Sequence, residues 1–588
     1  MDAQTEDIDG PIVIIGAGPA GLSAAHELVQ VGYRPLVLEV GTRVGGIART
    51  ETFRGFHFDI GGHRFYTKLH WIQQLWEEML GKDFLKVSRL SRIYYRGRFF
   101  SYPLKMANAL TNLGLVESTR IVASFLRAQT FPSVAEETFE QWMINRFGDR
   151  LYRIFFKTYT EKVWGIPCTE IRADWAAQRI MGLSLVSVVS NALFGSQGSK
   201  TLVDRFHYPS RGPGMMWQKF RETVEQGGGE IRLSTEAVKI FHRKGQIRTV
   251  TAKSGDTSIE YPASHVISSM PINCLMTALE PAPPQTVLEA AHGLTYRALV
   301  LVGLIIRAQS PFHDQWIYVH SPSVKVGRIQ NFKNWSAQMA PGPERTNVGM
   351  EYFCNKGDAI WSMPDRDMVQ LATEELVQLG LAQHDQVEDG FVIRQPGAYP
   401  VYDQAYKGHL ETIRSYLDGF TNLQTIGRNG MHRYNNMDHS MQTGILAARN
   451  IFGANKDIWS VNTDDAYLEE RYSPRTIEAV KQTFSPLDAP ALGTAVGSVC
   501  ALLIFAATLW LVLKGGAVVG PNLSLLAQYF PGYSVTLRGT LIGAVYGFTA
   551  GFVFGWGIAA LRNRLVSVAL EKMRRKAVFS VIGRFFKP

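Results

Sequence analysis

The stretch "PIVIIGAGPAGLSAAHELVQVGYRPLVLEVGTRVGG", residues 11–46, decides the fold. A short β-branched run leads into Gly16, Gly18 and Gly21. An Ala- and Leu-rich helix then precedes a second strand that ends at Glu39. Such glycines permit a tight turn and let a pyrophosphate approach the helix N-terminus, while the carboxylate binds a ribose hydroxyl. Because strand, helix, second strand and carboxylate are in register, the stretch predicts a βαβ dinucleotide-binding unit of an α/β protein.

A second glycine pair follows the second strand, in the segment "RVGG". This additional loop resembles the flavin-binding signature of the glutathione-reductase-like and amine-oxidase-like flavoenzymes, and the resemblance favours FAD over NAD. FAD is therefore the predicted cofactor. Its expected contacts in this part of the chain are Gly16, Gly18, Gly21, Glu39, Arg43, Gly45 and Gly46.

The segment "NLQTIGRNGMHRYNNMDHSMQTGILAARNIFG", residues 422–453, predicts a strand, a turn, a loop and a helix that opens near Asp438. A helix N-terminus at the pyrimidine edge of the isoalloxazine would stabilise the negative charge of a reduced flavin. A surface helix with an Asp cap is the local alternative, but it leaves the polar and aromatic cluster before the cap unexplained. The expected cofactor contacts here are Gly427, Arg428, Met437 and Asp438.

The segment "FHFDIGGHRFYTKLHW", residues 56–71, has more polar and aromatic groups than a core needs. Five of them follow directly after a predicted strand: Gly61, Gly62, His63, Arg64 and Tyr66. We expect these residues to face the cofactor and the edge of a ligand site. The alternatives are that Arg64 is a surface cation and that His63 packs on the flavin without transferring a proton.

Four segments together resemble the UDP-galactopyranose mutases. They are "GGHRFYT", "FFKTYTEKVWG" (155–165), "VGRIQNF" (326–332), and "AYPVYDQAYKGHL" followed by "IGRNGMHRYNNMDHSM". The likeness is patchy and runs from about residue 11 to residue 455. It implies an FAD-binding Rossmann-like domain of the glutathione-reductase type, with an inserted helical and β-stranded substrate domain.

The resemblance also implies roles for individual residues. His63 would lie at the flavin face, Arg328 would hold the phosphate next to a sugar, and the sugar pocket and flavin boundary would contain aromatic residues. The catalytic residues expected from this carry-over are His63, Arg328, Arg428, Tyr159 and Tyr434. The expected substrate-binding residues are Trp164, Arg64, Tyr66, Arg179, Arg211, Tyr399 and Tyr402.

The chain departs from the mutase pattern after "TEIRADWAAQRI". The mutases supply a second phosphate-binding arginine and a nucleotide-stacking region there, and Arg179 and Arg211 are the candidate replacements in this chain. The nearly uncharged segment 183–194 predicts either a buried helix or a surface against lipid or an isoprenoid chain. The departure affects the expected contacts to the uridine part of a substrate. The expected contacts to the sugar and the phosphate are unchanged.

The mutase reaction, as the resemblance implies it, transfers no net electrons. N5 of a reduced flavin attacks the anomeric carbon and expels the phosphate, the sugar ring opens and recloses with another hydroxyl, and the phosphate returns. The leaving group is a phosphate, so arginines matter more than a general base. The sequence contains no evident catalytic carboxylate pair and no metal-ligand cluster, so we predict no metal.

Two other functions remain open. One is an FAD-dependent oxidoreductase similar to protoporphyrinogen oxidases, amine oxidases and carotenoid desaturases, acting on a hydrophobic substrate. The segment "HYPSRGPGMMW", residues 207–217, resembles a loop of that group. The other is a flavin-bearing scaffold without turnover.

Two apolar runs, Leu492–Leu513 and Leu541–Leu561, follow the catalytic body. Each has the roughly 20 uncharged residues that a helix needs to cross a bilayer, so we predict two membrane spans. The tail Arg562–Pro588 carries eight Lys or Arg and one Glu. The positive-inside tendency therefore puts the tail and the catalytic body on the cytoplasmic side of a bacterial-type inner membrane.

The same tail spaces apolar and basic residues like an amphipathic helix on an anionic leaflet, with a solvated basic tail as the alternative. The net charge of +10 owes much to this tail and does not indicate nucleic-acid binding. The four cysteines are scattered without metal spacing, which is typical of a reducing compartment.

The combined prediction is a membrane-anchored sugar mutase for cell-envelope glycans. Its expected partners are a sugar phosphate, either nucleotide-linked or lipid-linked, and membrane lipid; a homodimer or larger oligomer is compatible with the sequence. The expected FAD domain is discontinuous, at 11–70, 225–280 and 390–455. The expected substrate domain covers 71–224, helical up to about 192, and 285–389. A linker at 456–490, the two spans within 491–561 and the tail at 562–588 complete the chain.

Overall fold

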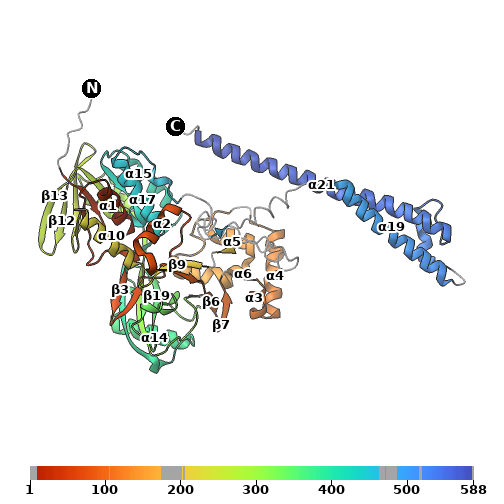
Figure 1. Cartoon of the computed structure of the whole chain (residues 1–588), viewed down its shortest axis with the longest axis horizontal. Helices are drawn as coiled ribbons and strands as arrows, with labels where there is room; N and C mark the ends of the chain where they lie inside the picture. The colour runs from red at the N-terminus through yellow and green to blue at the C-terminus, as the bar shows by residue number, and fades with distance from the viewer. Residues whose placement is uncertain are drawn as a thin grey trace. The chain divides into compact units, whose positions relative to one another are not determined.

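The computed structural model divides the chain into two compact units, Met1–Arg471 and Tyr472–Pro588 (Figure 1). The described residues are 10–102, 104, 106–133, 136–173, 201–202, 205–462, 470–471, 487–515 and 519–585.

A five-stranded parallel sheet forms the nucleotide-binding part of the first unit. Its order is β10 (Glu230–Arg232), β2 (Leu36–Leu38), β1 (Ile12–Ile15), β14 (His265–Ser268) and β21 (Leu423–Thr425). All four residues of β1 are buried, as expected for a parallel strand covered on both faces. One face packs against α1 (Pro19–Gln30), α2 (His70–Leu80), α10 (Gly214–Gln226) and α17 (Met437–Ile451).

The other face of this sheet packs against a second, four-stranded sheet and three helices. The four-stranded sheet has the order β13 (Thr257–Pro262), β12 (Gln246–Ser254), β11 (Glu236–Arg243) and β15 (Leu279–Glu280). The helices are α11 (Ile272–Ala278), α12 (Gln285–Gly293) and α15 (Tyr406–Leu417). The expected βαβ start, the later strands and the helix near Asp438 are therefore all present.

A seven-stranded sheet forms the substrate part. Its order is β20 (Val387–Pro400), β16 (Tyr296–Ile306), β19 (Thr346–Cys354), β18 (Arg328–Asn331), β17 (Trp316–Val319), β6 (Ser91–Tyr95) and β7 (Arg98–Ser101). Ten of the eleven residues of β16 are buried, because this strand lies between β19 and β20 and is covered on one face by α14 (Asp365–Gln378). The nearby short helix is α13 (Ala359–Ser362).

Two small pairings connect the two parts. The hairpin of β3 (Thr50–Phe53) and β4 (Phe56–Asp59) follows the second glycine loop, and β5 (Phe84–Ser88) pairs with β9 (Arg205–Pro209). The remaining short elements are η1 (Gly46–Ala48), η2 (Gly81–Asp83), η4 (Phe332–Asn334), η5 (Ala337–Met339), η6 (His384–Gln386), α16 (Gly427–Gly430), η7 (Ile458–Ser460), and the pair of β8 (Thr201–Leu202) with β22 (Glu470–Arg471).

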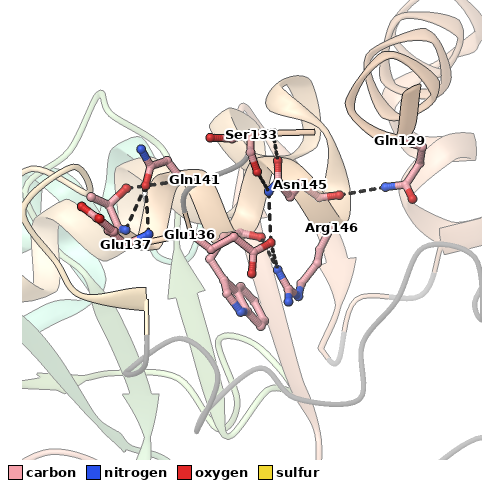
Figure 2. A network of polar contacts seen from close by, with 9 residues as sticks. Gln129, Ser133, Glu136, Glu137, Gln141, Asn145 and Arg146 are labelled. Carbon is pink, nitrogen blue, oxygen red and sulfur yellow. Dashed lines mark hydrogen bonds and ion pairs between the residues drawn. The ribbon is translucent and has the colours of Figure 1, made fainter. Parts of the chain in front are cut away.

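A group of helices holds the segment "FFKTYTEKVWG". It consists of α3 (Met106–Leu113), α4 (Leu115–Thr130), α5 (Phe139–Phe147), α6 (Asp149–Tyr152), the π-helical turn η3 (Arg153–Lys157) and α7 (Thr158–Trp164). Figure 2 shows how Asn145 joins α4 to α5: its backbone carbonyl accepts from Gln129 Nε2 at 2.8 Å, and its side chain pairs with the backbone of Ser133. Arg146 bonds Glu136 at 2.7 Å in the same network.

Three expected domain limits differ from the structure. The region from 71 to 101 contains the strands β5, β6 and β7, because their apolar residues alternate over runs too short for a helix. The strand β20 belongs to the seven-stranded sheet, whereas the sequence predicts 390–455 in the FAD domain. The helices α2 and α10 lie in the core of the nucleotide-binding part, whereas the sequence predicts 71–224 in the substrate domain.

The second unit contains two long helices, α19 (Ala489–Lys514) and α21 (Leu537–Phe585), with α20 (Pro521–Ser524) and η8 (Leu525–Gln528) between them. The segments Ala489–Lys514 and Leu537–Arg564 are long and apolar enough to cross a membrane. The two helices pack closely through glycines: a Cβ on Gly551 would come 2.9 Å from Cα of Gly497. Small residues let two helices approach each other closely in this way.

The first glycine turn has a specific steric requirement at Gly21. A Cβ on Gly21 would overlap the carbonyl oxygen of Gly16, so α1 can lie this close to β1 only with glycine there. We predict that Gly21→Ala lowers the free energy of unfolding by about 1–3 kcal/mol and reduces the amount of bound FAD. Thermal unfolding followed by flavin fluorescence measures both effects.

The matched control is Gly408→Ala in α15, where an added Cβ would meet no described atom within 4 Å. Alanine is the better helix former, so this variant should be as stable as the wild type or more stable by up to about 1 kcal/mol. Equal stability of both variants would contradict the steric account of Gly21.

Candidate active site

The two glycine loops lie directly on each other. Gly45 N donates to the carbonyl of Ala17 at 2.8 Å, and a Cβ on Gly46 would come 3.2 Å from Cα of Gly18. The absence of side chains leaves the backbone N–H groups of the α1 N-terminus accessible to a phosphate. The expected dinucleotide contacts Gly16, Gly18, Gly21, Gly45 and Gly46 are therefore brought together at one place.

Glu39 lies at the end of β2 and is buried. Its Oε2 accepts from Ala17 N at 2.6 Å and its Oε1 accepts from Gly41 N at 2.8 Å. These bonds hold the carboxylate at the edge of the first glycine loop, where the sequence predicted a ribose contact.

The N-terminus of α17 carries the clearest indication of a bound group. Asp438 is 2% exposed, and neither of its carboxylate oxygens has a hydrogen-bond partner among the described residues. His439 Nδ1 lies 3.8 Å from Asp438 Oδ1, beyond hydrogen-bond distance. A buried carboxylate without hydrogen bonds is costly, and ligand donors would relieve that cost. The helix itself is capped by Asn436 in a capping box with His439, so Asp438 is not the cap that the sequence alternative proposed.

Two other expected contacts flank this helix. Gly427 has a φ of +78° and donates its N–H to Thr443 Oγ1 at 3.0 Å, which places the end of β21 against α17. Met437 is buried in the core of the nucleotide-binding part.

His63 lies between this helix region and the substrate sheet. Its Nδ1 is 3.2 Å from the carbonyl oxygen of Gly61. Desolvation by burial, together with the charges of Arg428 and Arg328, lowers the pKa of His63 to about 3, although the Gly61 bond opposes this. The imidazole is therefore neutral at physiological pH, with one ring nitrogen as a donor and the other as an acceptor.

The glycines before His63 press on the substrate sheet. A Cβ on Gly62 would overlap the indole ring of Trp316, and a Cβ on Gly61 would come 3.4 Å from Glu351 Oε1. The guanidinium of Arg64 lies over Trp316, 5.6 Å from the ring centroid, so Arg64 points toward the site and is not the outward surface cation of the alternative. Tyr66 is partly buried at the same segment.

Four aromatic side chains from three parts of the chain gather here, and we call them the aromatic box: Trp164, Tyr399, Tyr402 and Tyr434. The centroid of Trp164 lies 6.0–6.4 Å from those of the three tyrosines. Tyr399 and Tyr434 stack with centroids 5.7 Å apart. Tyr402 OH accepts from Tyr434 N at 2.6 Å, which fixes the loop that precedes α17.

Arg428 adjoins the aromatic box from the cofactor side. Its guanidinium carbon lies 4.5 Å from the Tyr434 centroid and 5.8 Å from that of Tyr399. It donates to two backbone carbonyls, Asn435 O at 2.9 Å and Ala398 O at 3.2 Å. Among the described residues no carboxylate pairs with Arg428, so its charge is available to an anionic ligand.

Arg328 also reaches the aromatic box, at Tyr399, and it is not isolated. It forms an ion pair with Glu351 and donates to Tyr399 OH. Both ionic side chains are almost fully buried. Burial is the largest single effect and would lower the pKa of Arg328. Glu351, together with the nearby tyrosines, outweighs burial and raises that pKa well above its ordinary value. Sequence reasoning missed Glu351, a lone acidic residue in the apolar run "TNVGMEYFC".

Tyr159 lies beside this pair. It stacks on His320 with centroids 4.7 Å apart and 8° between the planes. Desolvation raises the pKa of Tyr159 well above its ordinary value, against the opposing charge of Arg328, so the phenol stays protonated. His320 is buried; desolvation and then the charge of Lys162 lower its pKa to about 3.

Lys162 supports the Arg328 strand from α7. Its ammonium donates to the carbonyls of Ser321 at 2.7 Å and Val326 at 3.2 Å. The latter is two residues before Arg328 in the sequence. Burial lowers the pKa of Lys162 to about 8, and Glu375 opposes that shift. Neither His320 nor Lys162 was predicted. Lys162 lies in the segment "FFKTYTEKVWG", and His320 follows the apolar run "WIYV".

Two expected site residues lie elsewhere, and a third falls outside the described residues. Arg43 is half exposed and its Nε lies 3.6 Å from Glu51 Oε2, and it lines a surface cavity together with the exposed Arg211. Arg211 therefore does not supply the second phosphate contact of the aromatic box. Arg179 and the segment 183–194 lie outside the described residues.

The nucleotide-binding part has two glycine loops and, at the N-terminus of α17, a buried carboxylate without hydrogen bonds. It is joined to a substrate part with an aromatic site. This combination defines a two-domain flavoprotein. The model of the family of flavin containing amine oxidoreductases matches residues 19–452, and the chain belongs to this family. FAD is accordingly its cofactor, and the residues described above fit that cofactor.

The names of individual relatives describe different activities. The chain is 22% identical over 290 residues to an inactive all-trans-retinol 13,14-reductase of Danio rerio, covering 44% of this chain and 47% of the relative. It is 26% identical over 173 residues to a probable UDP-galactopyranose mutase of Klebsiella pneumoniae, covering 28% and 43%. The matches span less than half the length of either relative.

The structure of a reduced UDP-galactopyranose mutase superposes with a TM-score of 0.68 at 20% identity and covers 79% of this chain and 100% of that chain. The resemblance seen in the sequence is thus confirmed at the level of the fold. Identity this low assigns no substrate.

Asp59 is the last residue of β4 and lies four residues before His63. Its carboxyl group has a pKa near neutral pH. It is fully buried at the end of β4 and accepts from Tyr208 OH and from Thr50 Oγ1. Burial raises its pKa from 3.8 to about 7, although both hydroxyl donors oppose the shift.

The raised pKa of Asp59 predicts a pH dependence with a definite sign. Between pH 4 and 7 the folded protein holds this proton while the unfolded chain has lost it, so the contribution of Asp59 to stability falls as pH rises. From pH 5 to 7 the wild type should lose about 2–3 kcal/mol relative to Asp59→Asn. Denaturant unfolding at both pH values measures this difference, and parallel pH profiles of the two proteins would contradict the raised pKa.

Proposed function

We propose that this chain is a flavin-dependent mutase that interconverts the ring forms of a phosphate-linked sugar. The observation that carries the proposal is the aromatic box with two arginines beside it, of which Arg428 has no described carboxylate partner. Aromatic faces suit sugar rings, and guanidinium groups suit a departing phosphate.

The chain's own residues supply binding and charge. The aromatic box holds the sugar, Arg428 holds the phosphate, and Tyr159 and Tyr399 contribute protonated phenol groups near Arg328. His63 is neutral and offers one donor and one acceptor at the cofactor side. Bound reduced flavin supplies the nucleophile for the anomeric carbon; no acid–base carboxylate pair is required of the protein.

The second unit favours a substrate at the membrane. Its two apolar helices are long enough to cross a bilayer, and a tethered enzyme is suited to a polyprenyl-phosphate-linked sugar more than to a freely diffusing nucleotide sugar. We therefore propose a cytoplasmic-membrane enzyme for cell-envelope glycans, with the carrier lipid-linked or nucleotide-linked.

One observation favours a second function. Glu351 already neutralises Arg328 in the buried ion pair, which leaves the aromatic box with fewer free cations than two phosphates would need. An oxidoreductase acting on a hydrophobic substrate needs no phosphate contact, and the family to which the chain belongs includes amine oxidoreductases.

Positional isotope exchange tests the mutase proposal. The reduced protein is incubated with a sugar diphosphate donor that carries ¹⁸O in the bridge between the anomeric carbon and phosphorus. Cleavage and return of the phosphate moves the label to a non-bridging position, which is read by ³¹P NMR. We expect exchange in the wild type and a loss of at least about tenfold in Arg428→Lys, because lysine cannot make the bidentate phosphate contact.

The matched control is Arg433→Lys. Arg433 belongs to the same loop but donates to the carbonyls of Trp459 and Val461, outside the aromatic box. Exchange per bound flavin should be unchanged in this variant. Equal exchange in Arg428→Lys and wild type would remove Arg428 from the proposal. Oxidation of a hydrophobic substrate without isotope exchange would support the oxidoreductase instead.

A further inference from the structure

A cavity of about 570 Å³ lies outside the aromatic box, between the second glycine loop, the β3–β4 hairpin and α10. Its described lining residues are Thr42, Arg43, Val44, Arg49, Thr50, Thr52, His57, Arg211, Gly214, Met215, Gln218, Lys219, Arg221 and Glu222. Five of these side chains are cationic and one is acidic. None of the aromatic-box residues and neither Arg328 nor Arg428 is among them.

The cavity adjoins the start of the second glycine loop, whose Arg43 and Val44 line it. Trp217 is fully buried, donates its indole N–H to the carbonyl of Ala48 at 3.0 Å, and packs against Gly45. The buried face of α10 thus holds the second glycine loop. Its outer face presents Lys219 and Arg221 to the cavity.

Most of the cations already have carboxylate partners. Glu51 lies 2.6 Å from Arg49 and 3.6 Å from Arg43. Lys219 pairs with Glu222 at 3.2 Å. Arg221 pairs with Glu225 at 2.8 Å, outside the lining.

Arg211 differs from the other cations. The structure gives its side chain no hydrogen bond or ion pair to any described residue, and it is exposed. His57 Nδ1 lies 3.1 Å from Thr52 Oγ1. Burial, and next the positive charge of Arg211, lower the pKa of His57. At neutral pH, His57 and Thr52 therefore contribute an uncharged imidazole and a hydroxyl to the cavity lining, which offer hydrogen bonds without adding charge.

We propose that this cavity binds a phosphate group through Arg211, with Lys219 as a second cation, at a site separate from the aromatic box. Guanidinium and ammonium groups with threonine hydroxyls are the side chains that proteins use for phosphate, and the volume accommodates a pyrophosphate or a phospholipid headgroup. The chemistry is the same for a soluble phosphate and for a lipid phosphate, so the source is settled by the experiment below.

Arginine-specific labelling tests this site directly. The full-length holoprotein is placed in phosphatidylcholine nanodiscs and treated with phenylglyoxal, with and without inorganic pyrophosphate. Peptide mass spectrometry then gives the labelling rate of Arg211. We expect at least about fivefold protection of Arg211, and no protection of Arg366, an exposed arginine on α14 that does not line the cavity.

Two further arms complete the test. Nanodiscs of phosphatidylglycerol without pyrophosphate distinguish a lipid phosphate from a soluble phosphate. Protection of Arg211 only in phosphatidylglycerol identifies a lipid headgroup. Protection of Arg211 by pyrophosphate in phosphatidylcholine identifies a soluble phosphate. Lys219→Gln should weaken either protection by at least about threefold with FAD content unchanged. Equal labelling of Arg211 under all conditions, or protection unaffected by Lys219→Gln, would overturn the proposal. Neither result depends on turnover at the aromatic box.

Discussion

The buried ion pair between Arg328 and Glu351 organises the substrate side of this protein. The two residues are directly opposite each other on β18 and β19. Glu351 also accepts from Gln330 and lies beneath Gly61, while Arg328 donates to Tyr399 OH. One pair thus connects the sheet, the segment before His63 and the aromatic box. Removing one member of such a buried pair typically costs about 3–5 kcal/mol, because the other charge is left without compensation.

This constraint also shapes the electrostatics of the candidate site. The positive charge of Arg328 is balanced by Glu351, whereas Arg428 contacts backbone carbonyls and aromatic rings and has no carboxylate partner among the described residues. A phosphate would therefore interact first with Arg428 and would have to compete with Glu351 for Arg328. The two arginines are therefore unequal, and a sugar bound at the aromatic box would have its phosphate directed to Arg428.

The nucleotide-binding part could be predicted from the sequence because its signals are local. Gly16, Gly21 and Glu39 lie within one βαβ unit, and their spacing alone determines the turn, the close helix contact and the carboxylate at the strand end. The pairing of Arg328 with Glu351 depends on the register of two strands, which composition and periodicity do not give. The same holds for Lys162, whose carbonyl partners come from a loop more than a hundred residues later.

The fold does not decide the chemistry, because mutases and oxidoreductases share it. The redox state of the flavin during product formation distinguishes mutases from oxidoreductases most directly. The protein is reduced anaerobically and incubated with nucleotide-linked and polyprenyl-linked sugars, while sugar ring forms are followed by NMR and the flavin by its absorbance. The account predicts many isomerised sugars per flavin, with the flavin still reduced at the end. Product formation that requires oxidised flavin, or that stops at one product per flavin, would contradict it.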